Sequence, residues 1–187
     1  MNLYNSPPGS VSLGGILIGL GILTWYGARW WYKGRPKGKG KKSGDGEAVE
    51  TSTRDWKELL PLASGLVYGS AMVACVGGLI GWTAYYISNL NSGGGNTALA
   101  GTTGAQGRDM ATNDITYLTD GGALIVAVAL VALIALWKKI PKKKRIQLAA
   151  GVWAGVSLAY SSGLAGTLGR TISPLLNGAG DPFVGVL

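Results

Sequence analysis

The sequence predicts an all-α integral membrane protein with four transmembrane helices in two hairpins, and three observations carry this prediction. Charged residues make up only 14% of the 187 residues, against about 25% in ordinary soluble proteins. Apolar residues reach 47%, and almost all of the charge is confined to two short segments. Four uncharged stretches flank these segments, and each reaches at least the length of about 17 residues that a helix needs to cross a bilayer.

The four expected transmembrane helices cover residues 11–32, 58–90, 121–137 and 148–169. The first is not expected to be a cleaved signal peptide, because residues 1–10 carry no positive charge and the basic residues follow the apolar run. Four buried helices of a soluble protein are the alternative. That alternative is disfavoured because the remaining residues are too few to coat a soluble surface.

The distribution of positive charge predicts the topology. Segment 33–57 with the flanking Arg29 and turn 138–147 hold all but two of the 17 Lys and Arg residues. The positive-inside rule places both segments in the cytoplasm. Both lie on one side only if all four stretches span, so the N-terminal and C-terminal tails, 1–10 and 170–187, are expected on the non-cytoplasmic side.

The segments between the expected helices differ in character. The cytoplasmic loop 33–57 is rich in Gly and Lys and cannot bury enough apolar surface to fold alone. The external loop 91–120 is rich in Gly and Thr and is expected to be flexible. The tail 170–187 ends in apolar residues and is expected to be exposed, and docking on a partner or lying in the membrane interface is the alternative.

Several chemistries lack their usual residues. The chain contains no His, which excludes a Ser-His-Asp triad, His-ligated haem and ordinary zinc sites. The single Cys, Cys75, is expected to be a small core residue. No charged residue falls near the middle of an expected helix, whereas proton relays and ion-coupled transporters require charged residues there. We therefore expect no enzyme activity, no catalytic residue, no metal site and no cofactor.

Small residues recur at four-residue spacing in three expected helices, which lets helix backbones approach closely in lipid. Packing within this chain and packing between copies are equally favoured. The candidate packing residues are Gly15, Gly19, Gly65, Gly69, Gly77, Gly81, Gly151, Gly155, Ala159 and Gly163.

Two basic clusters are candidate sites for anionic lipid or nucleic acid, since Lys and Arg beside helix ends attract both. For the cluster 138–145, topology and lipid contact are favoured. Nucleic acid is not the favoured partner, and the looser run 33–42 is its better candidate. The residues are Lys33, Arg35, Lys37, Lys39, Lys41, Lys42, Lys138, Lys139, Lys142, Lys143, Lys144 and Arg145.

These features predict a non-enzymatic membrane protein that self-assembles into a homo-oligomer or scaffolds partner membrane proteins. A holin-like pore or small channel is the alternative. In architecture alone the chain resembles the small polytopic membrane proteins of phages and conjugative plasmids, without a motif specific to them. That resemblance implies a prokaryotic plasma membrane or a virus-associated bilayer.

A helix, aromatic residues, a basic segment and a second helix occur twice in the same order. Two hairpins in one orientation arise either from duplication or from topology alone. The sequence pattern by itself favours topology.

Overall fold

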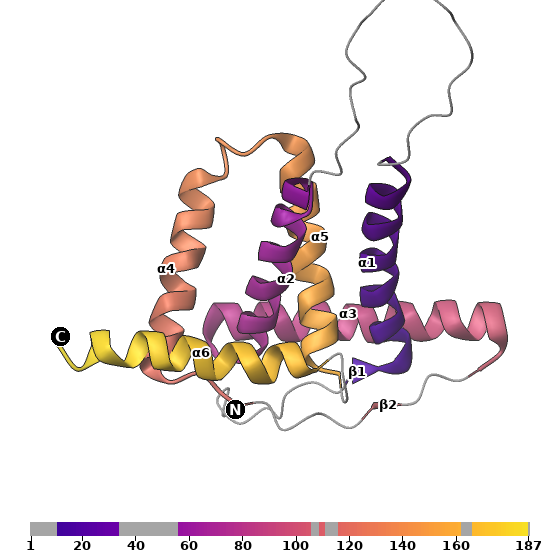
Figure 1. Cartoon of the computed structure of the whole chain (residues 1–187). Coiled ribbons are helices and arrows are strands. Elements are labelled where there is room, and N and C mark those ends of the chain that lie inside the picture. Colours follow the sequence, from indigo (N-terminus) through magenta and orange to yellow (C-terminus); the bar gives the residue numbers. More distant parts are fainter. Residues whose placement is uncertain (1–10, 34–55, 106–108, 111–115, 162–165, 187) are drawn as a thin grey trace, which may run out of the picture.

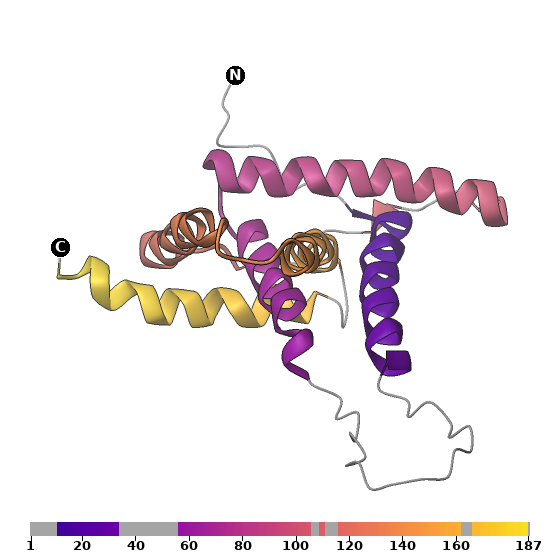
Figure 2. The same ribbon diagram turned by 90° about the horizontal axis from the view of Figure 1, so that it is seen from above.

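A computed structural model describes residues 11–33, 56–105, 109–110, 116–161 and 166–186, and most of these residues are helical. Four helices, named here the upright helices, run between the same two ends of the molecule: α1 (Leu13–Lys33), α2 (Leu60–Val73), α4 (Asp120–Leu136) and α5 (Lys142–Ala159) (Figure 1). Two lateral helices lie across one end, α3 (Gly78–Thr103) and α6 (Thr167–Val184). Seen from above, α3 lies on one side of α5 and α6 on the other (Figure 2).

The upright helices alternate in direction. α1 and α4 start at the end where the lateral helices lie, whereas α2 and α5 start at the opposite end and run back (Figure 1). A short 3-10 helix, η1 (Trp56–Glu58), precedes α2. The two-residue strands β1 (Val11–Ser12) and β2 (Asp109–Met110) pair antiparallel, with Val11 opposite Met110.

The expectation of one continuous helix over 58–90 is wrong. α2 ends at Val73 and α3 begins at Gly78, and the two helices are bent by 106° at this break. Gly78 has a φ of +70°, a left-handed conformation that only glycine adopts without strain. The apolar composition continues through the break, so hydropathy gave no sign of it.

The expected flexible loop 91–120 is helical over its first part. α3 continues to Thr103 and ends at Gly104, which also has a φ of +70° and caps the helix. Its hydroxyl side chains bond within the helix, as Thr97 does when it donates to the carbonyl of Gly93 at 2.9 Å. Packing of the Gly95 face against α1 supplies the stabilisation that the composition lacks.

α4 lies within one residue of the expected helix 121–137. The fourth expected helix, 148–169, differs more. α5 begins at Lys142 and ends at Ala159, and the tail expected to be exposed forms the amphipathic helix α6. Burial of Gly169, Ile172 and Ser173 against the upright helices explains why this tail is ordered.

The two halves of the chain repeat the same structure. Each half has an upright helix running away from the lateral helices, a second upright helix running back and a lateral helix (Figure 1). Buried positions correspond at constant spacing along the chain. α2 and α5 match at Leu62 and Leu148, Gly65 and Gly151, Gly69 and Gly155, and Met72 and Leu158. α3 and α6 match at Ala84 and Gly169, Ile87 and Ile172, Ser88 and Ser173, and Gly95 and Gly180. Membrane topology alone does not require a lateral helix in each half. Its presence in both halves therefore favours duplication as the origin of the repeat.

The same capping and crossing contacts occur in both halves. Ser12 and Thr119 are the hydroxyl N-caps of α1 and α4, accepting from the N–H of Gly15 at 3.2 Å and of Gly122 at 3.3 Å respectively. α1 crosses α3, and α4 crosses α6, at a point where two glycine backbones touch. These crossing pairs are Gly14 with Gly95 and Gly121 with Gly180.

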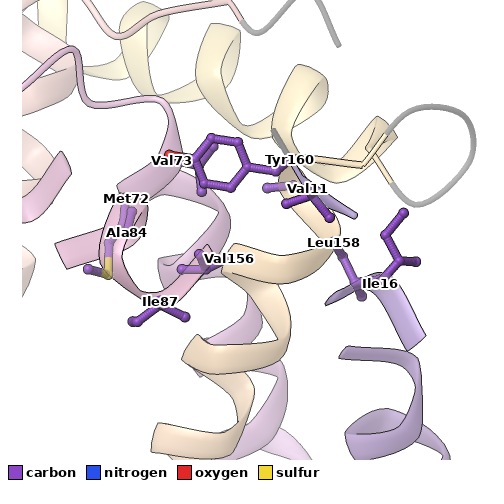
Figure 3. Packing of buried hydrophobic residues seen from close by; sticks show 10 residues of the cluster. Val11, Ile16, Met72, Val73, Ala84, Ile87, Val156, Leu158 and Tyr160 are labelled. Atoms are coloured by element: carbon purple, nitrogen blue, oxygen red, sulfur yellow. The ribbon is translucent and has the colours of Figure 1, made fainter. Parts of the chain in front are cut away.

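The larger hydrophobic cluster lies where α2 and α5 meet α3 and the start of α1. Met72 and Val73 of α2 and Val156 and Leu158 of α5 are buried in it, together with Tyr160 (Figure 3). The cluster fixes the break after α2 and the end of α5 at the same level. A second cluster joins α2, α4 and α6 around Val126 and Ile172.

Candidate functional site

Close helix packing joins α2 to α5 along a line of glycines that we call the glycine seam: Gly65, Gly69, Gly151 and Gly155. A Cβ atom on Gly65 would lie 3.1 Å from the Cα of Gly151 and would overlap the carbonyl oxygen of Leu148. A Cβ atom on Gly151 would meet Gly65 in the same way. No side chain fits at these positions while the two backbones remain in contact.

The other half of the glycine seam is equally tight. A Cβ atom on Gly69 would lie 2.9 Å from the carbonyl carbon of Val152, and one on Gly155 would lie 3.0 Å from the Cα of Leu66. The structure therefore brings together four of the ten predicted packing residues in one contact. This contact is within the chain, so these glycines are not free to pack against a second copy.

The predicted packing residues of α1 also contact neighbours in this chain. A Cβ atom on Gly15 would lie 3.3 Å from the backbone nitrogen of Ser92, and one on Gly19 would lie 3.0 Å from the Cβ of Ser157. Ala159 is buried and lies next to Gly169 of α6. α1 thus packs on both α3 and α5.

Two predicted packing positions are corrected. Gly77 has open space around the position of a Cβ atom, and the nearest neighbour of such an atom on Gly81 is the carbonyl oxygen of Cys75 at 2.8 Å. Both glycines lie at or just after the break between α2 and α3, so the four-residue spacing does not continue along one helix face. Gly163 lies outside the described residues.

The cations of the upright helices gather at the end opposite the lateral helices, which we call the basic end (Figure 1). α1 and α4 end there and α2 and α5 begin there. The described members are Arg29, Lys33, Lys57, Lys138, Lys139, Lys142, Lys143, Lys144 and Arg145. The predicted residues Arg35, Lys37, Lys39, Lys41 and Lys42 lie outside the described residues.

Arg145 holds the turn between α4 and α5. Its guanidinium donates to the carbonyl oxygens of Ile140 at 2.6 Å and Lys138 at 3.0 Å, and lies 5.8 Å from the ring centre of Trp137. These contacts satisfy carbonyl groups in the turn after α4 and add a cation–π interaction. Arg145 thus has a structural role in this turn, and its predicted contact with anionic lipid or nucleic acid stays a prediction.

A cavity of about 220 Å³ opens at the basic end between α1, α5 and the start of α2. Its wall combines three cations and one carboxylate with aromatic and aliphatic side chains. The lining residues are Tyr26, Arg29, Trp30, Lys33, Glu58, Leu59, Lys143, Ile146 and Gln147. Lys33, at the end of α1, and Lys143, at the start of α5, line this cavity together although both carry positive charge.

Lys33 and Lys143 were predicted as cations of this region, but not as parts of one cavity. No binding role was predicted for Tyr26, Trp30 or Gln147. The available signal was the repeated aromatic-plus-basic pattern at the end of one helix and the start of another. Their meeting depends on α1 packing against α5, which that pattern does not specify.

A buried polar contact between α3 and α5 was also missed. Asn91 is 2% exposed, donates to the hydroxyl of Ser157 and accepts from the indole N–H of Trp153 at 2.5 Å. Ser157 in turn donates to the backbone carbonyl of Trp153 at 2.9 Å. The matching position in the second half is Leu176, so this polar contact belongs to the first half alone.

Among the described helices, none alone combines the length and hydropathy of a membrane span, while α2 and α3 together meet both criteria across their bend. No protein family, characterised protein or solved structure matches this chain.

Proposed function

We propose that this chain is a non-enzymatic polytopic membrane protein that scaffolds partners in a bilayer, with its basic end in contact with anionic lipid on the cytoplasmic side. In this proposal α1, α2, α4 and α5 cross the bilayer. The observation that carries it is the separation of cations, gathered at one end, from sides that are apolar. Such a separation follows the positive-inside rule.

Large apolar side chains exposed on the upright helices support this placement. Trp25 on α1 is 67% exposed, and Val131 and Ile134 on α4 are each 65% exposed. A soluble chain would leave these side chains in water at a cost of about 25 cal/mol per Å² of apolar surface. Lipid removes that cost, because its acyl chains are as apolar as the side chains.

Two of the proposed spans have a length that can cross a bilayer. α1 has 21 residues and is about 31 Å long at 1.5 Å per residue. α4 has 17 residues, the short limit for a span, and all of them after Asp120 are uncharged. α2 has 14 residues, fewer than a span needs, and in this proposal η1 extends it.

The lateral helices fit the opposite membrane surface. Trp82 and Tyr86 on α3 stack with their ring centres 5.6 Å apart and are exposed. α6 exposes Leu175 and Phe183 beside its packed face. Aromatic and apolar side chains of this kind lie at the boundary between headgroups and acyl chains.

The glycine seam does not support self-assembly, because its residues are used within the chain. Scaffolding would use the uncovered sides of the upright helices, above all α4, where Val128 and Val131 face outward. The basic loop 33–57 keeps nucleic acid as an alternative partner, which a salt-dependent DNA gel shift with the full-length protein would test.

Two measurements test the proposed function. In bacterial cells the protein is expected in the membrane fraction after an alkaline carbonate wash and to be released only by detergent. For topology, Cys75→Ser removes the native thiol, and Lys139→Cys or Thr102→Cys then places one thiol at the basic end or at the end of α3.

A membrane-impermeant maleimide is expected to label Thr102→Cys in intact cells and to label Lys139→Cys only after the cells are opened. Release of the protein by carbonate would refute membrane insertion. Equal labelling of both thiols in intact cells, or labelling of Lys139→Cys alone, would refute the orientation.

A further inference from the structure

We propose that the cavity at the basic end binds one phosphate group of an anionic lipid headgroup, with Lys33 and Lys143 as its direct contacts. This inference rests on the proposed membrane placement and goes beyond it. The proposed function requires only diffuse attraction between lipid and the basic end. The cavity provides a single defined site.

The first argument is that two like charges line one cavity. Lys33, from the last turn of α1, and Lys143, from the first turn of α5, both form part of its wall. Two ammonium groups on one cavity wall repel each other, and water screens the repulsion only in part. An anion between them turns the repulsion into two attractive charge-assisted hydrogen bonds.

The second argument is the balance of charge in the cavity. Arg29 adds a third cation to the wall, and Glu58 is the one carboxylate that lines it. The carboxylate offsets one of the three cations and leaves an excess of positive charge. A phosphate diester carries the single negative charge that this excess accommodates, and Lys143 additionally places it near the positive end of the α5 dipole.

The third argument is the apolar part of the wall, which selects a lipid over a free anion. Tyr26, Leu59 and Ile146 line the cavity together with the cations, and Ile146 is 63% exposed. A free phosphate would gain nothing from these side chains. The glycerol and first acyl carbons of a lipid would cover them.

The internal repeat provides a comparison within the same molecule. At the matching end of α4, Leu136 and Ile140 occupy the positions that Arg29 and Lys33 occupy on α1. The second half therefore lacks the two cations that α1 contributes. The protein is therefore expected to bind one lipid molecule in this way. Two lipid molecules would be expected only if both halves formed such a cavity.

The test is native mass spectrometry of the full-length protein, released in detergent from vesicles of phosphatidylcholine with phosphatidylglycerol. The wild-type protein is expected to retain one phosphatidylglycerol. Lys33→Gln with Lys143→Gln is expected to retain it about thirtyfold more weakly. The loss of each cation near the surface weakens binding about fivefold, and the two effects multiply. Lys138→Gln with Lys144→Gln removes the same charge outside the cavity and is expected to keep the lipid.

Two further arms make the outcomes decisive. Lys33→Arg with Lys143→Arg keeps both charges and is expected to retain the lipid, and thermal unfolding in detergent alone checks that every variant folds. Equal loss of lipid from both glutamine pairs would show diffuse attraction and overturn the site. Retention of added inorganic phosphate without phosphatidylglycerol would overturn the lipid as its source.

The two proposals fail separately. Release by carbonate would refute membrane insertion and with it the lipid site. A protein that resists carbonate but retains no phosphatidylglycerol would refute the site alone.

Discussion

The glycine seam makes a quantitative prediction for the variant Gly65→Ala. Its new Cβ would lie 3.0 Å from the backbone nitrogen of Val152 and 3.1 Å from the Cα of Gly151, where ordinary contacts begin at 3.4 Å. It would also overlap the carbonyl oxygen of Leu148. All three neighbours are backbone atoms, so the helices themselves must separate, by on the order of 1 Å.

The expected loss of stability follows from two opposing effects. Overpacking of this kind costs about 1–3 kcal/mol, and the upper part of that range applies because backbone cannot turn aside. Alanine stabilises a helix interior by about 1 kcal/mol relative to glycine. The net destabilisation of Gly65→Ala is therefore about 2 kcal/mol, which lowers the unfolding temperature by roughly 4–8 °C in a chain of this size.

The assay is thermal unfolding in mild detergent, followed by circular dichroism. Gly21→Ala on α1 is the matched control, because a Cβ atom there meets nothing within 4 Å and only the gain in helix propensity remains. Gly151→Ala is expected to match Gly65→Ala, and the double variant to lose less than the sum, since one separation accommodates both methyl groups. An equal shift for Gly65→Ala and Gly21→Ala would refute the seam.

Three other predictions concern contacts away from the seam. Asn91→Leu is expected to destabilise the fold by about 1–3 kcal/mol, because the indole N–H of Trp153 loses its acceptor, measured as a lower unfolding temperature. Burial raises the pKa of the Cys75 thiol to about 11, so the fraction of thiolate at pH 8 is about a hundredfold lower than for an ordinary cysteine. Iodoacetamide is therefore expected to alkylate Cys75 slowly in the folded protein and at an ordinary rate in the unfolded protein. Thr119→Val removes the N-cap of α4 and a 2.6 Å hydrogen bond to Asp181, and about 1 kcal/mol is expected to be lost in the same unfolding assay.

Matched controls separate these effects from general disruption. Asn89→Leu changes an exposed asparagine on the same helix and is expected to leave the unfolding temperature nearly unchanged. Thr97→Val removes a hydroxyl that bonds only within α3. Equal destabilisation by a variant and its control would contradict the corresponding contact.

Raising the pH tests Cys75 in a second way. The folded chain holds the pKa of the thiol above its ordinary value of 9.0, so folding favours the protonated form. The resulting stabilisation is complete below pH 9 and decreases as the pH rises toward 11. Cys75→Ser is expected to lose this part of the pH dependence.

The sequence predicted α4 well and the α2–α3 region poorly, for one physical reason. Hydropathy and charge mark where an apolar helix can form, and α4 is a single uncharged run that follows the cap Thr119. The break before α3 depends instead on the left-handed backbone of Gly78. The sequence pattern does not distinguish a glycine that packs against another helix from one at which the chain bends.

α6 shows what the sequence did contain. Its packed face repeats at helical spacing through Gly169, Ile172, Ser173 and Leu176. Residues 170–187 were instead expected to form an exposed tail, and no helix was assigned to them. Comparison with the same spacing on α3 would have identified the helix.

The candidate site was predictable in its residues and unpredictable in its grouping. Lys33 and Lys143 were each selected on charge alone. Their meeting requires α1 to lie against α5, and α1 does so because Gly19 admits the side chain of Ser157 at close range. No pattern within either segment specifies that neighbour.

The glycine seam also constrains the order in which the protein can be completed. Gly65 enters the growing chain long before Gly151, so ribosomes that add about 5–20 residues per second leave on the order of ten seconds between the two. During that interval α2 presents a bare backbone groove whose intended occupant has not yet been made. The α2 of another nascent chain carries the same groove, with glycines at the same spacing. Premature pairing of two such first halves is therefore the error that synthesis of this protein must outpace.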